Sequence, residues 1–378
     1  MNIRAVVLAA VVAAGCGGTD NDGASAVQQV RIDNDPSALL VTVDSIGIEI
    51  GDTNYVMGGV EGIAFGPDGC IAVLDCGRST VRIYSPEGEY LRSIGRRGNG
   101  PGELGNVTSM AISEGGYVFL SGIGSETTGL HTYDYGTGEW LGTYRTFVPP
   151  GCLEGAGANR YVRRDIDFEV DGDDVFLPVS ISMYEAGNDE PITTYFEEKI
   201  PFDPADEVGL LELDWYGYDV AVGLDGSVFI APRSTTEALV FVFDPAGSRT
   251  GILELPYERA ERSSEEMEME RNILRAKAVA SGENTEGLEP DPYKPMIRGL
   301  ETDGDGNLWV LQGGPSVPTF TVLDPSGGFF CTAKVSGDPP DGSTWRFCFD
   351  ESGILAYAED PACGFQKVYV LQARFSGE

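Results

Sequence analysis

Four short apolar runs within residues 60–105 constrain the fold of this chain more than any other feature. Turn sequences separate the runs at residues 67–69 (PDG), 76–79 (CGRS) and 86–88 (PEG). Gly tolerates positive backbone φ angles and Pro presets a negative one, so these sequences favour tight reversals of the chain. Four strands joined by such turns form an antiparallel meander, which has the size of one blade of a β-propeller.

The same pattern recurs along the chain, and such recurrence is typical of repeat architectures. Further copies cover residues 107–147, 164–213, 218–255 and 297–335. In the copy at 164–213, strands are expected at residues 165–170, 174–179, 193–200 and 209–213. The repeat therefore predicts at least five blades.

The sixth copy, within residues 345–375, has only three predicted strands. Residues 46–51 (IGIEIG) align with residues 91–95 (LRSIG), the fourth strand of the first copy, and we expect them to complete the sixth blade. A ring closed in this way leaves no unpaired sheet edge at the junction. The sequence thus predicts an all-β fold, a six-bladed β-propeller closed by an N-terminal strand that completes the last blade.

A helical insertion is predicted between blades four and five, within residues 257–296. Residues 258–280 lack Gly and Pro and mix charged side chains with Met267, Ile273 and Leu274, a composition that favours a helix. The insertion would leave the ring on the face that carries the inter-blade loops. It could cover the channel or dock a partner there, and a charge-rich helix equally suits a solvated decoration.

The N-terminal residues have the features of an export signal. Arg4 precedes an apolar run at residues 5–14 that is too short to span a bilayer. Residues 13–16 (AAGC) resemble a bacterial lipobox, and this resemblance implies cleavage before Cys16, lipidation of Cys16 and, because Gly17 follows, transfer to the outer membrane. Ordinary secretory cleavage is the alternative.

Three regions follow from these features. We expect a signal peptide at residues 1–15, a lipidated Cys and flexible tether at 16–37, and the propeller at 38–378. The tether prediction depends on the Gly, Asp and Ser content of residues 17–27, which suits a flexible leash.

Charge and cysteine content limit the partners of the propeller. The chain has 60 acidic and 25 basic residues, a net charge of −35, so we exclude nucleic acid and expect membrane contact only through the lipid anchor. The cysteines other than Cys16 can form disulfides in an exported chain, and we expect Cys76 to pair with Cys363 across the ring closure. With His131 as the single histidine, we expect no zinc site and a packed or hydrogen-bonded role for this side chain.

Several segments resemble known propellers. Residues 62–75 (GIAFGPDGCIAVLD) and 86–95 (PEGEYLRSIG) are similar to NHL-repeat propellers. Residues 98–103 (GNGPGE), together with P-x-I-x-x-L at 295–300 and G-x-L-W-V at 306–310, resemble bacterial six-bladed propeller lipoproteins of unassigned function. The resemblance covers residues 38–375 and implies the fold without implying an activity, because propellers carry unrelated functions.

Two Gly-rich segments are better explained as connections than as ligand loops. Residues 95–105 lack the Gly-Lys-Ser/Thr of a phosphate loop and are predicted to join two blades. Residues 303–307 (DGDGN) begin like a calcium loop but have Leu308 at its sixth position and Gly314 at its twelfth, so we expect a turn.

Arginines are predicted to gather on one face of the ring, where inter-blade loops and the turns after second strands meet. They are Arg78, Arg96, Arg97, Arg163, Arg233, Arg298 and Arg346. In an acidic chain such cations would focus the field on an anionic ligand, because guanidinium binds carboxylate or phosphate through paired hydrogen bonds. The alternative is that each arginine pairs with a nearby carboxylate, such as those of Asp75, Glu61, Asp165 and Glu301.

The sequence favours an exported envelope lipoprotein that acts as a non-catalytic binding or scaffolding propeller for a protein partner or a small anionic ligand. No catalytic residue, metal ligand or cofactor is predicted for this function. The alternative is a calcium-dependent hydrolase or lyase of the gluconolactonase-like propeller type, with carboxylates from several blades in the central channel.

Overall fold

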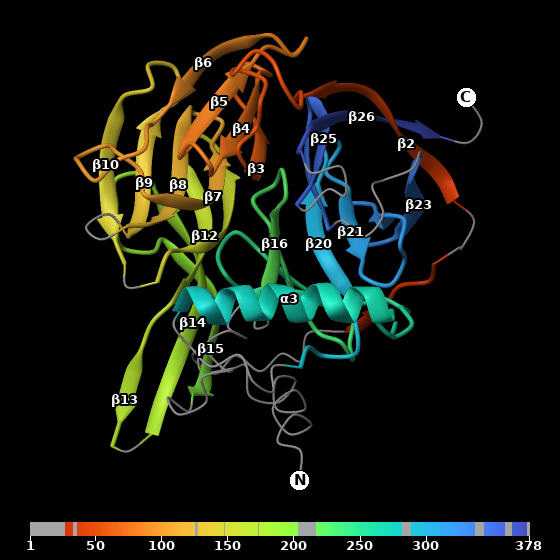
Figure 1. Cartoon of the computed structure of the whole chain (residues 1–378). Helices are drawn as coiled ribbons and strands as arrows, with labels where there is room; N and C mark the ends of the chain where they lie inside the picture. Colours follow the sequence, from red (N-terminus) through yellow and green to blue (C-terminus); the bar gives the residue numbers. More distant parts are fainter. Residues whose placement is uncertain are drawn as a thin grey trace.

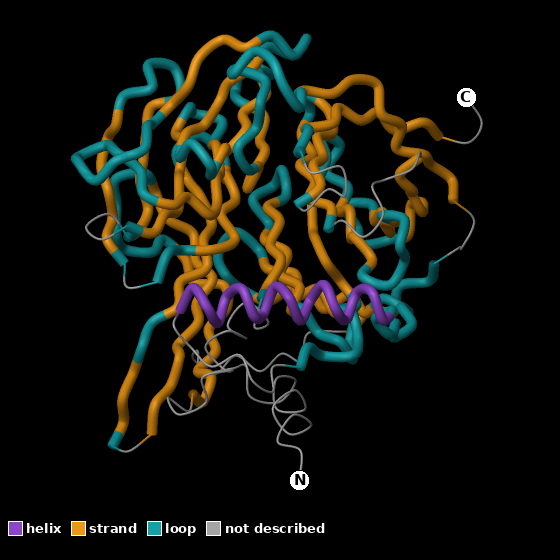
Figure 2. The backbone as a smooth tube through the Cα atoms, viewed as in Figure 1, coloured by secondary structure: helices purple, strands orange, loops and turns teal. Residues whose placement is uncertain are grey.

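The structure is a computed structural model. It describes residues 27–32, 36–124, 128–146, 148–172, 174–202, 217–281, 289–336, 344–359 and 365–375. Within these ranges the chain is a ring of antiparallel β-sheets with one long helix outside the ring (Figure 1, Figure 2).

Four strands form each of the first three blades. Blade one contains β3 (Val60–Phe65), β4 (Ile71–Asp75), β5 (Thr80–Tyr84) and β6 (Tyr90–Ile94). Blade two contains β7 (Asn106–Ile112), β8 (Tyr117–Ile123), β9 (Gly129–Asp134) and β10 (Trp140–Arg145). Blade three contains β11 (Gly151–Ala156), β12 (Arg160–Ile166), β14 (Asp174–Glu185) and β15 (Thr193–Phe202).

The other three blades complete the ring. Blade four contains β16 (Tyr218–Val222), β17 (Val228–Pro232), β18 (Leu239–Phe243) and β19 (Arg249–Glu254). Blade five contains β20 (Ile297–Thr302), β21 (Leu308–Gln312), β22 (Thr319–Leu323) and β23 (Phe329–Ser336). Blade six contains β24 (Trp345–Asp350), β25 (Gly353–Ala358), β26 (Val368–Phe375) and, as its outer strand, β2 (Pro36–Ile46).

The first strand of each blade lies at the centre of the ring. These inner strands contact one another in the closed order β3, β7, β11, β16, β20, β24 and back to β3. The strands behind them are covered by blades on both sides, which is why β4 (IAVLD) and β5 (TVRIY) are buried along their whole length. The outer strand β6 (YLRSI) alternates instead, with Leu91 and Ser93 exposed or half-exposed. The predicted six-bladed propeller is confirmed.

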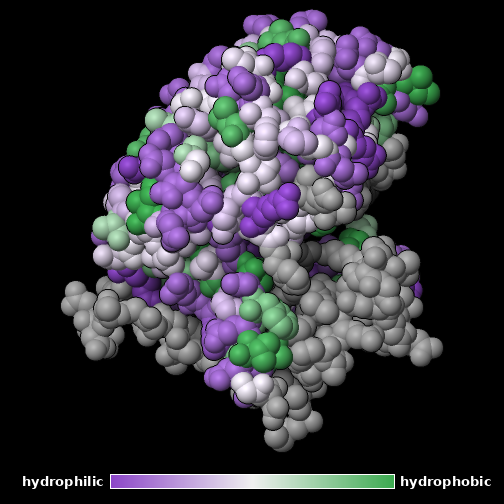
Figure 3. Space-filling view, turned by 90° about the vertical axis from the view of Figure 1, so that its left-hand side faces the viewer, coloured by the Kyte–Doolittle hydropathy of each residue, from purple (hydrophilic) through white to green (hydrophobic). Residues whose placement is uncertain are grey.

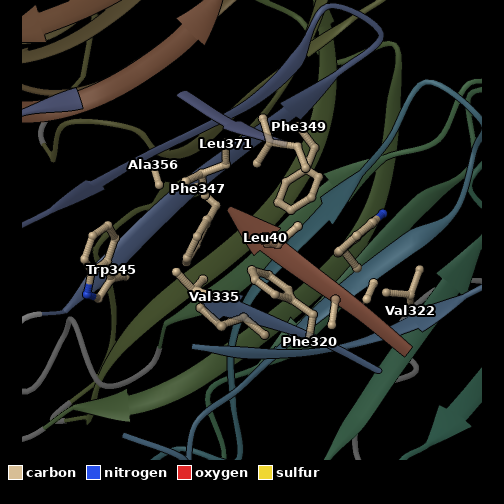
Figure 4. Packing of buried hydrophobic residues seen from close by; sticks show 14 of the residues in the cluster. Leu40, Phe320, Val322, Val335, Trp345, Phe347, Phe349, Ala356 and Leu371 are labelled. Atoms are coloured by element: carbon tan, nitrogen blue, oxygen red, sulfur yellow. The ribbon is translucent and has the colours of Figure 1, made fainter. Parts of the chain in front are cut away.

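The closing strand of blade six differs from the predicted one. Pairing with β26 extends from Ala38 to Ile46, so only the first residue of the predicted segment 46–51 belongs to the strand. The strand also pairs in parallel with β23, which joins blades five and six into one sheet. Figure 4 shows Leu40 of this strand among Phe320, Val322 and Val335. Burial of alternate side chains in residues 38–41 (ALLV) fixes the register of the strand. Residues 47–51 contain two Gly with positive φ, and the strand ends before them.

A second N-terminal strand lies within the segment predicted to be a flexible tether. Residues Val27–Gln29 form β1, which pairs in parallel with β19 at the outer edge of blade four. Val30 follows it and is buried in the core between blades four and five. The tether prediction is therefore corrected for residues 27–32 and 36–37, while residues 16–26 and 33–35 lie outside the described residues.

Blade three begins earlier than predicted. Its inner strand is β11, in a stretch where no strand was predicted. The strand predicted at 165–170 overlaps only the end of β12 and the start of β13, whereas the strand predicted at 174–179 lies within β14. The predicted strand at 209–213 lies outside the described residues. β14 and β15 pair from Val175 to Met183 and continue beyond the ring, where β13 (Glu169–Asp171) adds a third strand (Figure 1).

The outer surface on the side of blades two and three is mostly hydrophilic, with isolated apolar side chains (Figure 3). The exposed apolar residues of these blades include Trp140, Leu141, Phe168 and Val170. A mixed surface of this kind agrees with the acidic composition of the chain.

The predicted helical insertion is confirmed as α3 (Ser264–Ser281). Ser263 and Glu266 form a reciprocal capping box at its start, each side chain accepting the other residue's backbone N–H. Leu274 and Ala278 are buried, and Lys294 forms an ion pair with Glu266 at 2.5 Å. In Figure 1 the helix crosses the lower part of the ring. Neither α3 nor any other helix in the described part of the chain has the length and apolarity to span a membrane.

Candidate functional site

β-Bulges re-aim side chains at one end of several inner strands. The pairing register shifts between Val60 and Gly62 in β3, between Val107 and Ser109 in β7, and between Ile297 and Gly299 in β20. A longer irregularity interrupts β11 after Gly151. Bulges of this kind bend the strand and are common beside active sites and at barrel rims. The residue displaced in β20 is Arg298.

A backbone hydrogen bond between blades four and five brings Arg298 close to blade four. The backbone N–H of Met296 donates to the carbonyl oxygen of Ser234 at 2.7 Å, which brings the loop after β17 against the start of β20. Arg233 precedes Ser234 and binds Asp219 of β16 through two hydrogen bonds, Nη2–Oδ1 at 2.9 Å and Nε–Oδ2 at 3.2 Å. Arg233 and Arg298 therefore meet at the same end of the ring.

Arg346 joins them from blade six. Arg298 Nη2 donates to Thr344 Oγ1 at 3.0 Å, two residues before Arg346. Arg346 Nε donates to Glu359 Oε1 at 2.6 Å, and the backbone N–H of Glu359 donates to the Thr344 carbonyl oxygen. We call Arg233, Arg298 and Arg346 the arginine cluster. It is formed by three successive blades, and the sequence predicted all three residues for one face.

The three guanidinium groups differ in their electrostatic surroundings. The carboxylate of Asp219 raises the pKa of Arg233 above its ordinary value. Burial, the largest single effect, acts to lower the pKa of Arg346, but the neighbouring acidic groups, Glu359 first among them, together shift it upward. The pKa of Arg298 is lowered, first by burial and then by the positive charge of Arg346. Among the described residues, Arg298 forms no ion pair with a carboxylate.

The other predicted arginines do not belong to the cluster. Arg78 lies 3.8 Å from Asp75 and is half-exposed, and the exposed Arg96 pairs with Glu103 at 2.9 Å. Arg97 lines a pocket of about 370 Å³ between blades one and two, together with residues 98–99, 104–106 and 123–124. Arg78 and Arg96 thus pair with nearby carboxylates, whereas Arg97 Nη2 donates to Asn106 Oδ1 at 3.4 Å.

The prediction for Arg163 is wrong. This residue lies in the middle of β12, a second strand, and only 2% of its side chain is exposed. Its guanidinium binds Asp165 at 2.7 Å and lies over the rings of Tyr144 and Tyr184, at 4.5 and 3.8 Å from their centroids. Cation–π contact and an ion pair satisfy this side chain within the packing of the blades.

Two carboxyl groups lie deeper among the inner strands: Glu301, which the sequence named only as a possible arginine partner, and Glu154, which it did not single out. Burial raises the pKa of Glu154 in β11 to about 8, and the charge of Asp219 adds to the shift. Burial also raises the pKa of Glu301 in β20 well above its ordinary value, with Glu154 as the next cause. Glu301 accepts a hydrogen bond from the backbone N–H of Phe349 at 3.3 Å. At neutral pH Glu154 is therefore mainly protonated, and the raised pKa of Glu301 favours its protonated form.

Cys348 of β24 lies near these carboxyl groups. Its thiol pKa is raised well above the ordinary value, first by burial and then by the charge of Glu301. Cys152 of β11 donates through Sγ to the carbonyl oxygen of Tyr218 at 2.7 Å. Thiols with raised pKa values are poor nucleophiles at neutral pH, so neither residue has the character of a catalytic cysteine.

No metal site is formed by the part of the chain that the structure describes, in the sense that no three His, Cys, Asp or Glu side chains are arranged to hold an ion. Residues 303–307 form the predicted turn, in which Asp303 accepts from the backbone N–H groups of Asp305 and Asn307. His131 is buried and its Nδ1 lies 2.9 Å from Thr143 Oγ1, as predicted.

The predicted disulfide lies partly outside the described residues, because Cys363 is not among them. Cys76 lies directly after β4, as expected, and its Sγ is 3.8 Å from Glu61 Oε1. Cys16, the predicted lipidation site, also lies outside the described residues.

Comparison with known proteins supports the fold. A family model described as a 6-bladed beta-propeller matches residues 46–150. A solved structure from Bacteroides fragilis, described as an exported protein, has a TM-score of 0.54 at 10% identity and covers 92% of this chain and 100% of its own. A member of the duf4221 family from Bacteroides vulgatus has a TM-score of 0.49 at 10% identity, with coverage of 90% and 99%.

More distant similarity extends to the calcium-binding protein regucalcin from Agrobacterium tumefaciens, with a TM-score of 0.43, 11% identity and coverage of 89% and 97%. No curated protein gives a significant match to the chain. At these identities the comparisons bear on the fold alone. The family model and the Bacteroides fragilis structure, together with the closed order of the inner strands, show that the chain is a six-bladed β-propeller.

Proposed function

We propose that this chain is an exported, envelope-anchored propeller that binds a small anionic ligand at the arginine cluster without converting it chemically. The observation that carries the proposal is the state of Arg298. Its guanidinium is largely enclosed by protein and donates to Thr344, and no carboxylate among the described residues neutralises it. A cation held in this way gains favourable energy from an incoming anion, because burial weakens the competing interaction with water.

The surroundings of Arg298 support binding rather than catalysis. Arg233 and Arg346 are fixed by Asp219 and Glu359, so they can frame a ligand with their remaining N–H groups. The two carboxylates beside the arginine cluster, Asp219 and Glu359, are thus already paired with guanidinium groups. His131, the single histidine, is buried in blade two and bonded to Thr143.

Substitution of Arg298 by Gln tests the proposal. We expect any carboxylate or phosphate that binds the wild-type protein in isothermal titration to bind the Arg298→Gln variant roughly 10- to 100-fold more weakly, because a hydrogen bond to a charged group contributes about 1.5–3 kcal/mol. The matched control is Arg96→Gln, since Arg96 is exposed on the same face and paired with Glu103. Unchanged affinity in Arg298→Gln, or equal losses in both variants, would contradict the proposal.

Export and anchoring form the sequence-based part of the proposal. They depend on the apolar run at residues 5–14 and on Cys16. Membrane fractionation of cells that produce the wild-type chain or a Cys16→Ala variant tests the anchor. Recovery of both proteins in the same fraction would contradict it.

A further inference from the structure

The arginine cluster contains three guanidinium groups but offers only one uncompensated positive charge. Asp219 binds Arg233 through two hydrogen bonds, and Glu359 binds Arg346 at 2.6 Å. Arg298 donates to a neutral hydroxyl group. Each of the two ion pairs is close to neutral as seen by a ligand, so the charge available for an anion is that of Arg298.

The neighbouring acidic groups do not alter this balance at neutral pH. Burial raises the pKa of Glu154 to about 8, so it carries little charge at pH 7, and burial also raises the pKa of Glu301 well above its ordinary value, which favours its neutral form. Among the groups that face them, Asp219 is paired with Arg233 and Cys348 is a neutral thiol. Glu61 of blade one is exposed, so solvent and salt screen its charge.

We infer that the arginine cluster selects a monoanionic carboxylate over a dianion of similar size, an inference that rests on the proposed function. One carboxylate matches the single free guanidinium and its planar pair of N–H groups. A second anionic charge would enter a partly enclosed site in which the other two guanidinium groups of the arginine cluster already have a carboxylate partner. Burial of an unpaired charge is strongly unfavourable, so a dianion would lose more in desolvation than it gained in attraction.

Removal of one internal carboxylate should change this selectivity. In an Asp219→Asn variant, Arg233 loses its counter-charge and the site offers a second free guanidinium. In a Glu359→Gln variant, Arg346 is released in the same way. The two variants alter different blades, so one remains informative if the other folds poorly, and thermal melts report whether each is folded.

The probes are butyrate and succinate, which have the same number of carbon atoms and differ by one carboxylate. Titrations at pH 7 and constant ionic strength would measure the affinity ratio of butyrate to succinate for the wild type, Asp219→Asn and Glu359→Gln. We expect the wild type to bind butyrate more tightly. Each variant should shift the ratio towards succinate by roughly tenfold, the effect of one added charge several ångströms away at an effective dielectric constant of about 40.

The outcomes separate this inference from the proposed function. A wild type that prefers succinate, with binding lost in Arg298→Gln, would overturn the charge selectivity and leave the arginine cluster as the binding site. An unchanged ratio in both folded variants would also overturn the selectivity. Absence of binding for both probes in every protein would overturn the inference and the proposed function together.

Discussion

Arg298 owes its position to two local features of the chain. The bulge between Ile297 and Gly299 removes it from the regular alternation of β20, so the direction of its side chain is not set by the pleat of the strand. Gly313, at the end of β21, leaves room for the side chain: a Cβ there would overlap the carbonyl oxygen of Pro295 and lie 3.1 Å from Arg298 Cγ. Arg298 is thus held by backbone geometry, and a partner carboxylate is not required to fix it.

The buried Glu154 should make the stability of the folded protein depend on pH. Its pKa in the folded protein is about 8, above the ordinary value of 4.5, chiefly because of burial. The folded state therefore keeps a proton that the unfolded state releases at lower pH. The stability linked to this proton is fully present below about pH 4.5 and is lost as the pH rises through about 8.

The Glu154→Gln variant should lack this loss. We expect its melting temperature to rise relative to the wild type by a few °C between pH 5 and pH 8, since about 1–2 kcal/mol corresponds to a shift of roughly 2–4 °C or more in a chain of this size. Differential scanning calorimetry at several pH values measures the difference. Glu114→Gln, an exposed glutamate in the turn between β7 and β8, is the control. A difference that does not change with pH would contradict the assignment.

At the scale of elements, β2 connects the two ends of the chain. It completes blade six by pairing with β26 and also pairs with β23 of blade five. Leu40 is completely buried between these blades, while the neighbouring Leu39 is 44% exposed on the other face of the strand. The strand thus seals the ring by burying apolar side chains as well as by backbone pairing.

The Leu40→Ala variant tests this role. We expect it to reduce the free energy of unfolding by about 2–5 kcal/mol, the usual cost of a cavity at a buried leucine. Leu39→Ala is a matched control in the same strand and should change stability by less than about 0.5 kcal/mol. Urea unfolding of the two variants measures both values. Equal effects would show that pairing alone, without the buried side chain, closes the ring.

At the scale of the whole molecule, the inner strands bring acidic groups from distant parts of the sequence into one channel. Asp219 is already bound to Arg233, and burial raises the pKa of Glu154 to about 8 and that of Glu301 well above its ordinary value. A calcium ion prefers ionised oxygen ligands, so its binding there would have to displace the proton of Glu154. A binding propeller and a calcium-dependent enzyme therefore differ in the response to calcium that is expected of them.

Thermal melts with EDTA and with added calcium test this distinction. We expect the same midpoint in both conditions at pH 7, because a ligand stabilises a protein only if it binds the folded state. A magnesium titration controls for general effects of ionic strength on a chain with a net charge of −35. A midpoint several °C higher with calcium alone would favour the calcium-dependent enzyme over the proposed function.

The sequence by itself determined the blades. Turn residues and strand periodicity are local, so the repeat at 60–105 and its copies predicted the propeller, the helical insertion and an N-terminal closing strand. It also placed Arg233, Arg298 and Arg346 on one face, because their positions relative to strand ends follow from the repeat. It misplaced the closing strand and blade three, where β11 lies in a Gly-rich stretch with little apolar alternation.

Only the tertiary structure decided which charged groups meet. The isolation of Arg298, the pairing of Arg233 with Asp219 and the gathering of Glu154 with Glu301 depend on bulges, strand register and contacts between blades. A shift of one residue in register turns a side chain to the opposite face of a strand. The local sequence pattern does not fix the register. Which charged side chains meet at the channel therefore follows only from the assembled ring.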